Sequence, residues 1–190
     1  MLIKICGLKR LEDIEYANIL KPDFIGFVFA DSKRKIDIDL AIKLRNKLNK
    51  DIKVVGVFRN DDIELIKEVV KNNIIDLIQL HGDEDDSYIL KIKEFTNLPI
   101  IKAYRDSIYS DYSLFDNDNP GNGVTFDWNN INTNKPFFLA GGINIENIDN
   151  ALKINPYCID VSSGVETDGV KDFKKMEELI KRCRDEEGRN

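Results

Sequence analysis

Short apolar segments alternate with amphipathic segments from one end of the chain to the other. The apolar segments are rich in Ile, Val and Phe, which is typical of strands that are buried on both faces. We predict strands at residues 2–6, 23–29, 52–58, 75–80, 99–103, 112–116, 136–140 and 157–162.

The amphipathic segments have the spacing of helices with one apolar stripe. We predict helices at 11–20, at 39–49 with Asp39 as N-cap, from Asp61 or Asp62 onward, at 85–95, after Asn144 as N-cap, and at 171–184. Met176 and Cys183 fall on the apolar stripe of the last helix, so we interpret both as packing residues.

Strands that alternate with helices favour a closed (β/α)₈ barrel over an open doubly wound sheet. The chain of 190 residues is slightly shorter than the roughly 200 residues usual for that fold. Residues 104–111 are too few for a full fifth helix. We therefore predict one compact α/β domain over residues 1–190, a TIM barrel with a shortened or missing fifth helix.

The composition is that of an ordinary globular protein, with 42% hydrophobic and 33% charged residues. A net charge of −6 argues against nonspecific binding of nucleic acid. No apolar run approaches the roughly 20 residues that span a bilayer. The N-terminus leads directly into a strand, without the apolar region of a signal peptide.

The cysteine pattern indicates a reduced, cytoplasmic protein without a structural metal. Cys6, Cys158 and Cys183 are far apart and form no CxxC pair, and His81 is the single histidine. Cys158 lies within a predicted strand and is interpreted as core filler.

Cys6 ends the first predicted strand and precedes Gly7. Strand alternation places it on the same face as Lys4, and a nearby ammonium favours the thiolate, which can act as a base or nucleophile. The alternative is that Cys6 is a small buried apolar residue, the usual state of a free cysteine.

Two glycine-bearing loops follow the last two predicted strands. Gly141 and Gly142 follow the seventh, and Ser162, Ser163 and Gly164 follow the eighth. Glycine lets backbone N–H groups approach an anion, and the corresponding loops are the usual phosphate site of such barrels. Each loop alone could be a simple turn or helix cap, but the two together predict a phosphate site.

Other polar residues fall at the same end of the predicted barrel. Arg34 lies in a basic run, and its planar guanidinium suits a carboxylate. Asp127 lies between two aromatic residues that could raise its pKa toward the range of a general acid, although it could equally cap a short helix.

Gln79 and His81 follow the fourth strand, and His81 alone is more often a structural residue than a base. Asp160 shares a strand face with Cys158 and Ser162 and needs a partner, either Lys4 or a ligand hydroxyl.

Seven segments together make the chain closely similar to the phosphoribosylanthranilate isomerases. They are Lys4-Ile5-Cys6-Gly7, Gly26-Phe27-Val28-Phe29, Ser32-Lys33-Arg34, Gln79 with Leu80-His81-Gly82, Phe126-Asp127-Trp128, Ala140-Gly141-Gly142-Ile143, and Asp160 through Glu166. They run in order from residue 3 to about residue 175, and the first and last are the most specific.

The resemblance implies a cofactor-free (β/α)₈ enzyme of tryptophan biosynthesis. Its reaction would be the Amadori rearrangement of N-(5-phosphoribosyl)anthranilate to 1-(2-carboxyphenylamino)-1-deoxyribulose 5-phosphate. By resemblance, Cys6 matches the general base, Asp127 the general acid and Arg34 the residue that holds the anthranilate carboxylate. Gly142, Ser163 and Gly164 match the phosphate site, and we expect Gln79, His81 and Asp160 to contact substrate as well.

Other functions are compatible with parts of this pattern. A phosphoribosyl isomerase of histidine biosynthesis would show phosphate loops in both halves of the barrel and aspartates as acid and base. An indole-forming barrel would need a catalytic lysine and a longer N-terminal extension. A noncatalytic phosphoribosyl-binding module would need neither Cys6 nor Asp127, and a thiol-redox protein would need a nearby resolving cysteine. The expected partners are the small phosphosugar–anthranilate substrate and, if the protein is not a monomer, a second copy of the chain.

Overall fold

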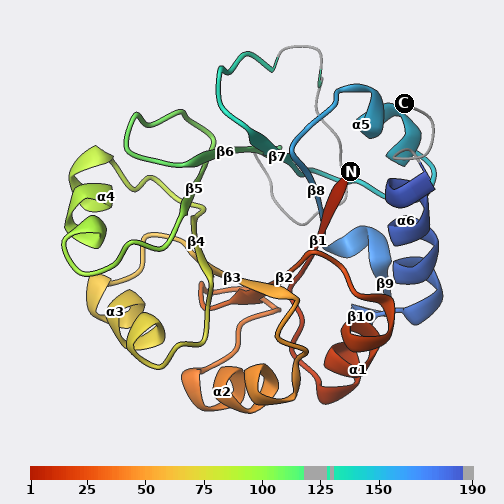
Figure 1. Ribbon diagram of the computed structural model, residues 1–190, viewed down its shortest axis with the longest axis horizontal. Helices are drawn as coiled ribbons and strands as arrows, with labels where there is room; N and C mark the ends of the chain where they lie inside the picture. The colour runs from red at the N-terminus through yellow and green to blue at the C-terminus, as the bar shows by residue number, and fades with distance from the viewer. Residues whose placement is uncertain (118–127, 129–130, 186–190) are drawn as a thin grey trace.

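Eight parallel strands form a closed barrel in chain order, β1 through β8 (Figure 1). The computed structural model describes residues 1–117, 128 and 131–185. The strands are β1 Leu2–Cys6, β2 Phe24–Val28, β3 Lys53–Phe58, β4 Leu77–Leu80, β5 Ile100–Ala103, β6 Tyr112–Phe115, β7 Phe137–Leu139 and β8 Cys158–Val161. Each lies within two residues of its predicted bounds, so the predicted barrel is confirmed.

Helices pack around the outside of this barrel (Figure 1). They are α1 Leu11–Leu20, α2 Ile38–Lys47, α3 Ile63–Lys71, α4 Asp86–Lys93, α5 Ile148–Lys153 and α6 Phe173–Asp185. The predicted start of α3 at Asp61 or Asp62 is confirmed, since Asp62 is its N-cap and accepts a hydrogen bond from the Glu64 backbone N–H.

Three predicted helix starts are wrong. Asp37, not Asp39, caps α2 by accepting from the Leu40 backbone N–H. Asn144 accepts from the Glu146 backbone N–H in a turn, and α5 begins later, with Asn147 as N-cap. Lys171 belongs to a strand rather than to α6, because residues 166–171 form a small hairpin before the helix.

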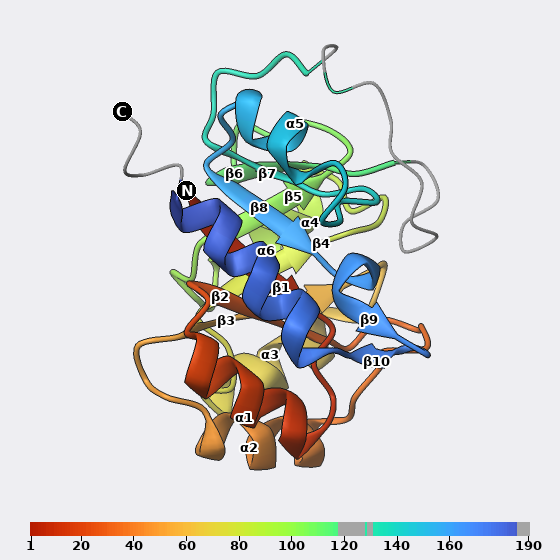
Figure 2. The ribbon, with the colours of Figure 1, turned by 90° about the vertical axis from the view of Figure 1, so that its right-hand side faces the viewer.

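That hairpin consists of β9 Glu166–Thr167 and β10 Val170–Lys171, which pair antiparallel. It follows β8 and a 3₁₀ turn, η2 Ser163–Val165, and lies at the end of the barrel where β8 terminates (Figure 2). The sequence pattern did not predict it, yet it brings Glu166 and Lys171 to the side of the barrel that carries Arg34.

The connection from β5 to β6 contains no helix among the described residues, as predicted. Lys102 of β5 is fully buried there and donates to the carbonyls of Gly82 and Ala103 and to the Glu84 carboxylate. These bonds join the end of β5 to the loop after β4.

Strand alternation divides the core into two clusters. Ile3 and Ile5 of β1 belong to the larger one, which lies between the strands and the helices. Cys6 packs against the smaller one, which contains Val55, Phe138 and Cys158. Lys4 and Cys6 therefore face the barrel interior, as their predicted shared face requires. No helix in the described part of the chain is long and apolar enough to cross a membrane.

Candidate active site

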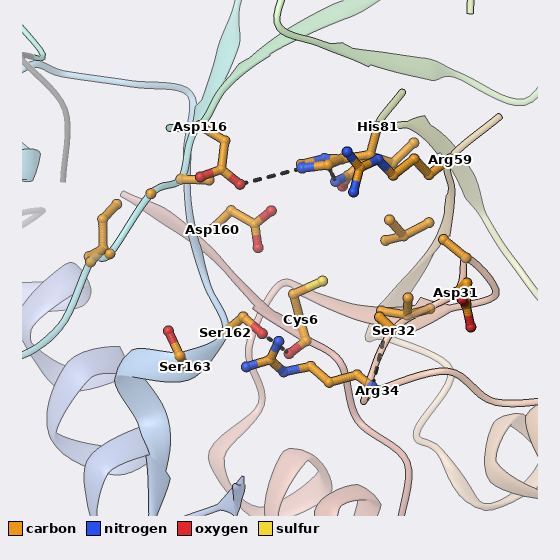
Figure 3. A pocket seen from close by; sticks show the side chains of 18 residues that line it. Cys6, Asp31, Ser32, Arg34, Arg59, His81, Asp116, Asp160, Ser162 and Ser163 are labelled. Carbon is orange, nitrogen blue, oxygen red and sulfur yellow. Dashed lines mark hydrogen bonds and ion pairs between the residues drawn. The ribbon is translucent and has the colours of Figure 1, made fainter. Parts of the chain in front are cut away.

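A cavity opens where the barrel strands end, and most of the predicted site residues line it (Figure 3). Those that line it are Cys6, Arg34, Gln79, His81, Gly141, Gly142, Asp160, Ser162 and Ser163. Gly164 is not among the lining residues, and Asp127 lies outside the described residues. The cavity thus unites residues from β1, β4, β8 and the loops that follow β2, β7 and β8.

Cys6 is partly exposed at the end of β1, beside Gly26 of β2. A Cβ at Gly26 would lie 2.6 Å from the Cys6 Sγ, so only glycine leaves room for the thiol. Burial raises the pKa of the Cys6 thiol above its ordinary value, although the charges of Lys4 and Lys171 act in the opposite direction. The thiolate is therefore a minor form near neutral pH and a strong base when present.

Lys4 is fully buried beneath the cavity. Its Nζ donates to the Asp160 carboxylate and to Gln79 Oε1, both at 2.7 Å. Lys4 is thus one of the two partners predicted for Asp160. The second carboxylate oxygen, Asp160 Oδ1, is buried and has no hydrogen-bond partner among the described residues. Asp160 lines the cavity, so this oxygen is the acceptor that a ligand hydroxyl would satisfy.

The same network continues to His81 at the rim. Gln79 Nε2 lies 2.9 Å from His81 Nδ1, and His81 Nε2 lies 3.0 Å from the Tyr104 hydroxyl and 3.4 Å from an Asp116 oxygen. The histidine ring is therefore held on both nitrogens.

Arg34 enters the cavity across Gly7. Gly7 has φ +83°, and a Cβ there would lie 2.4 Å from Arg34 Cδ, so glycine is required both by the backbone and by the arginine stem. The guanidinium forms a two-bond ion pair with Glu166, at 2.7 Å from Nε and 2.8 Å from Nη2. Glu166 lies in the last of the seven segments that carry the family resemblance, and the sequence pattern predicts no role for it.

The two glycine loops lie against each other at one side of the cavity. Gly141 and Gly142 have positive φ values of 89° and 66°. A Cβ at Gly164 would lie 2.0 Å from the Ile143 carbonyl oxygen, so Gly164 permits the contact between the loops. The Ser162 hydroxyl donates to the Cys6 carbonyl at 3.1 Å, which joins the loop after β8 to the end of β1.

Asp31, Arg59 and Asp116 also line the cavity, and the sequence pattern predicts no role for them. Arg59 directly follows β3, so extending the strand-end argument to the third strand would have found it. Asp116 likewise follows β6, whereas the sequence pattern includes it in the predicted strand at 112–116. Within the described residues, no group of His, Cys, Asp and Glu side chains is placed to hold a metal ion.

Comparisons with known proteins agree with this geometry. The model of the N-(5'-phosphoribosyl)anthranilate (PRA) isomerase family matches residues 3–182. The N-(5'-phosphoribosyl)anthranilate isomerase of Endomicrobium trichonymphae is 51% identical, over 94% of this chain and 96% of that protein. The crystal structure of the phosphoribosyl anthranilate isomerase of Thermus thermophilus has a TM-score of 0.88 at 32% identity, covering 97% of this chain and 99% of that one.

A further isomerase structure was solved in complex with reduced 1-(o-carboxyphenylamino)-1-deoxyribulose 5-phosphate. It has a TM-score of 0.81 at 32% identity and covers 97% of this chain and 100% of that one. The chain therefore belongs to the family of N-(5'-phosphoribosyl)anthranilate isomerases, the aldose–ketose isomerases of tryptophan biosynthesis.

Proposed function

We propose that the cavity around Cys6 catalyses the Amadori rearrangement of N-(5-phosphoribosyl)anthranilate by general acid–base catalysis. The observation that carries this proposal is the position of the Cys6 thiol in one cavity with Arg34, Asp160 and the two glycine loops. In this proposal Cys6 supplies the base, and Arg34 supplies a cation for the substrate carboxylate. Asp160 supplies an acceptor for a substrate hydroxyl, and the glycine loops supply backbone donors for the phosphate.

The chemistry needs one acid and one base. Protonation of the ribose ring oxygen opens the ring and leaves an iminium, and Asp127 takes this role by its match to the family pattern. The Cys6 thiolate then removes the C2′ proton, which gives an enolamine that tautomerises to the ketone. Each such group is worth about 10²–10⁴ in rate.

The remaining residues hold the substrate. The backbone N–H groups of Gly141, Gly142, Ser162 and Ser163 bind the phosphate, and Gly164 keeps the two loops together. Arg34 binds the anthranilate carboxylate through Nη1, which has no hydrogen bond to any described residue. Asp160 Oδ1 accepts a hydrogen bond from a ribose hydroxyl, and Gln79 and His81, which line the same cavity, contact the substrate as well.

Cys6→Ser and Asp127→Asn test the assignment, with Cys158→Ala as a control cysteine in the barrel interior. Freshly generated phosphoribosylanthranilate is supplied, and the change of anthranilate fluorescence follows conversion. We expect each of the first two variants to lose most turnover and still bind product, while Cys158→Ala keeps its activity. Near-full activity of Cys6→Ser or of Asp127→Asn would remove that residue from the mechanism.

We also propose a single-domain protein of the cytoplasm that works as a monomer or homodimer. The isomerase of Thermotoga maritima is described as dimeric, which supports the second form for this chain. Light scattering coupled to size exclusion distinguishes the two forms by mass.

A further inference from the structure

Three charged side chains form a cluster directly behind the cavity. Glu166 accepts two hydrogen bonds from Arg34 and one, at 2.8 Å, from the Lys171 Nζ. The side chains are almost inaccessible, with 10% of Arg34, 7% of Glu166 and 1% of Lys171 exposed. Arg34 lines the cavity, whereas Glu166 and Lys171 do not. Glu166 is thus placed to act on a ligand only through Arg34.

The pairing with Glu166 determines which part of the guanidinium faces a ligand. A guanidinium has five N–H donors in a rigid plane. Glu166 occupies the edge formed by Nε and Nη2. The donors that remain for a second carboxylate are those of Nη1 and the outer N–H of Nη2, which form the next edge of the same plane.

The charges of the cluster leave an excess for an anion. Arg34 and Lys171 each carry one positive charge and Glu166 one negative charge, so the sum is +1. Although burial raises the pKa of Glu166, hydrogen bonds from Arg34 and the charge of Lys171 lower it to about 2. Glu166 is therefore ionised under all ordinary conditions and keeps the guanidinium partly neutralised rather than free.

Neighbouring elements hold the cluster in place. Lys171 also donates to the Ser162 carbonyl, and the Lys175 Nζ donates to the Glu166 carbonyl. On the other side, the stem of Arg34 passes over Gly7, where no other residue would leave room. The arginine has little freedom to turn, which is the condition for a directional carboxylate contact.

We propose that Glu166 is a positioning residue that selects substrates with a carboxylate on the aromatic amine, because it turns the free edge of Arg34 toward the cavity. This inference rests on the proposed contact between Arg34 and the anthranilate carboxylate. Glu166 itself touches no reacting atom, and its effect is on substrate affinity rather than on proton transfer.

The test compares two substrates, phosphoribosylanthranilate and the analogue made from aniline, which lacks the carboxylate. Glu166→Gln keeps the size of the side chain and removes its charge. Arg34→Ala removes the proposed carboxylate contact. Glu64→Gln is the matched control, because Glu64 makes an exposed ion pair with Lys67 on α3, away from the cavity.

We expect Glu166→Gln to raise the KM for phosphoribosylanthranilate about tenfold, with little change in kcat. A tenfold factor corresponds to the loss of about one charge-assisted hydrogen bond to the substrate. The KM for the aniline analogue should stay the same, and Glu64→Gln should change neither KM. In a protein that already carries Arg34→Ala, adding Glu166→Gln should not change the ratio of the two KM values, which measures discrimination between the substrates.

Two results would overturn the proposal. In the first, Arg34→Ala loses discrimination but Glu166→Gln keeps it, which refutes the role of Glu166 and leaves the proposed function intact. In the second, Glu166→Gln raises the KM values of both substrates by the same factor, which indicates a purely structural role. Unchanged discrimination in Arg34→Ala would instead refute the proposed Arg34 contact. If Glu166→Gln does not fold, Glu166→Asp keeps the charge, shortens the side chain and is expected to shift the same KM ratio.

Discussion

Two fully buried lysines, Lys4 and Lys102, each pair with a carboxylate, and they have different surroundings. Lys4 lies on the inner face of β1 and bonds to Asp160 at 2.7 Å, while Asp160 Oδ1 is buried with no hydrogen-bond partner among the described residues. Lys102 lies on β5 and bonds to Glu84 at 3.3 Å and to two backbone carbonyls. The Glu84 oxygens also accept from the Asn60 and Gly82 backbone N–H groups. Within the described residues, the Lys4 pair leaves one carboxylate oxygen without a hydrogen-bond partner, and the Lys102 pair leaves none.

The electrostatics differ in the same way. Burial lowers the pKa of both ammonium groups, but at Lys4 the charges of Asp160 and Cys6 outweigh burial and raise it. At Lys102 burial prevails over Glu84, and the pKa is lowered. A buried ion pair is therefore not a functional signal by itself. The Lys4 pair differs from the Lys102 pair because Asp160 lines the cavity and keeps one oxygen without a hydrogen-bond partner among the described residues.

The largest expected effect is on stability, at the completed pair. Lys102→Met leaves the Glu84 charge buried without its ammonium, which should lower the free energy of unfolding by about 3–5 kcal/mol. Urea unfolding measures this, and kcat/KM of the folded protein should remain that of the wild type. A loss of kcat/KM at full stability would mean that the two pairs do not differ as described.

A third buried pair, Lys171 with Glu166, extends the comparison to stability at acidic pH. The pKa of Glu166 falls from 4.5 to about 2 on folding, so its ionisation contributes stability above 4.5 that is lost as the pH falls toward 2. The contribution is at most about 3 kcal/mol. The stability advantage of wild type over Glu166→Gln, from urea unfolding at several pH values, should shrink over that range. An advantage that is constant with pH would contradict the ionised pair.

Asp160→Asn and Glu84→Gln separate function from structure with the same chemical change. Asp160→Asn weakens the acceptor for a ligand hydroxyl, and we expect kcat/KM to fall about 10–100-fold, the range for a hydrogen bond to a charged group. Glu84→Gln should lower the free energy of unfolding and leave kcat/KM unchanged. Steady-state kinetics and urea unfolding of both variants provide the check. Equal effects of the two variants on kcat/KM would contradict the difference between the two pairs.

The smallest effect is expected in alkali, where the two lysines should act in opposite directions. The raised pKa of Lys4 contributes stability below 10.5 that is lost as the pH rises through the folded pKa. The lowered pKa of Lys102 imposes a cost that fades as the pH rises toward 10.5. Each slope is at most about 1.4 kcal/mol per pH unit. Unfolding of wild type against Lys4→Met and Lys102→Met measures both, and slopes of the same sign would be the contrary result.

The sequence predicted the barrel well because buried strands carry a strong apolar signal. It also predicted the ring of strand-end residues, since parallel strands bring their carboxyl ends together. It did not predict the β9–β10 hairpin, because strands of two residues show no periodicity. Because the hairpin was not predicted, the cluster of Glu166 and Lys171 with Arg34 was not predicted either. The pattern predicts Asp39 and Asn144 as caps because several cap-forming residues lie close together, whereas the backbone places the N-caps at Asp37 and Asn147.

Gly26 shows how a residue without a side chain can determine whether the proposed catalytic thiol fits. Its missing methyl group is the space that the Cys6 sulfur occupies. Replacement by alanine would push the sulfur aside or spread the first two strands apart. In a mutational scan Gly26 would then rank with the reactive groups. Inactive variants at this position would reflect lost room for the thiol, and growth assays alone would not distinguish them from variants that lack the thiol itself.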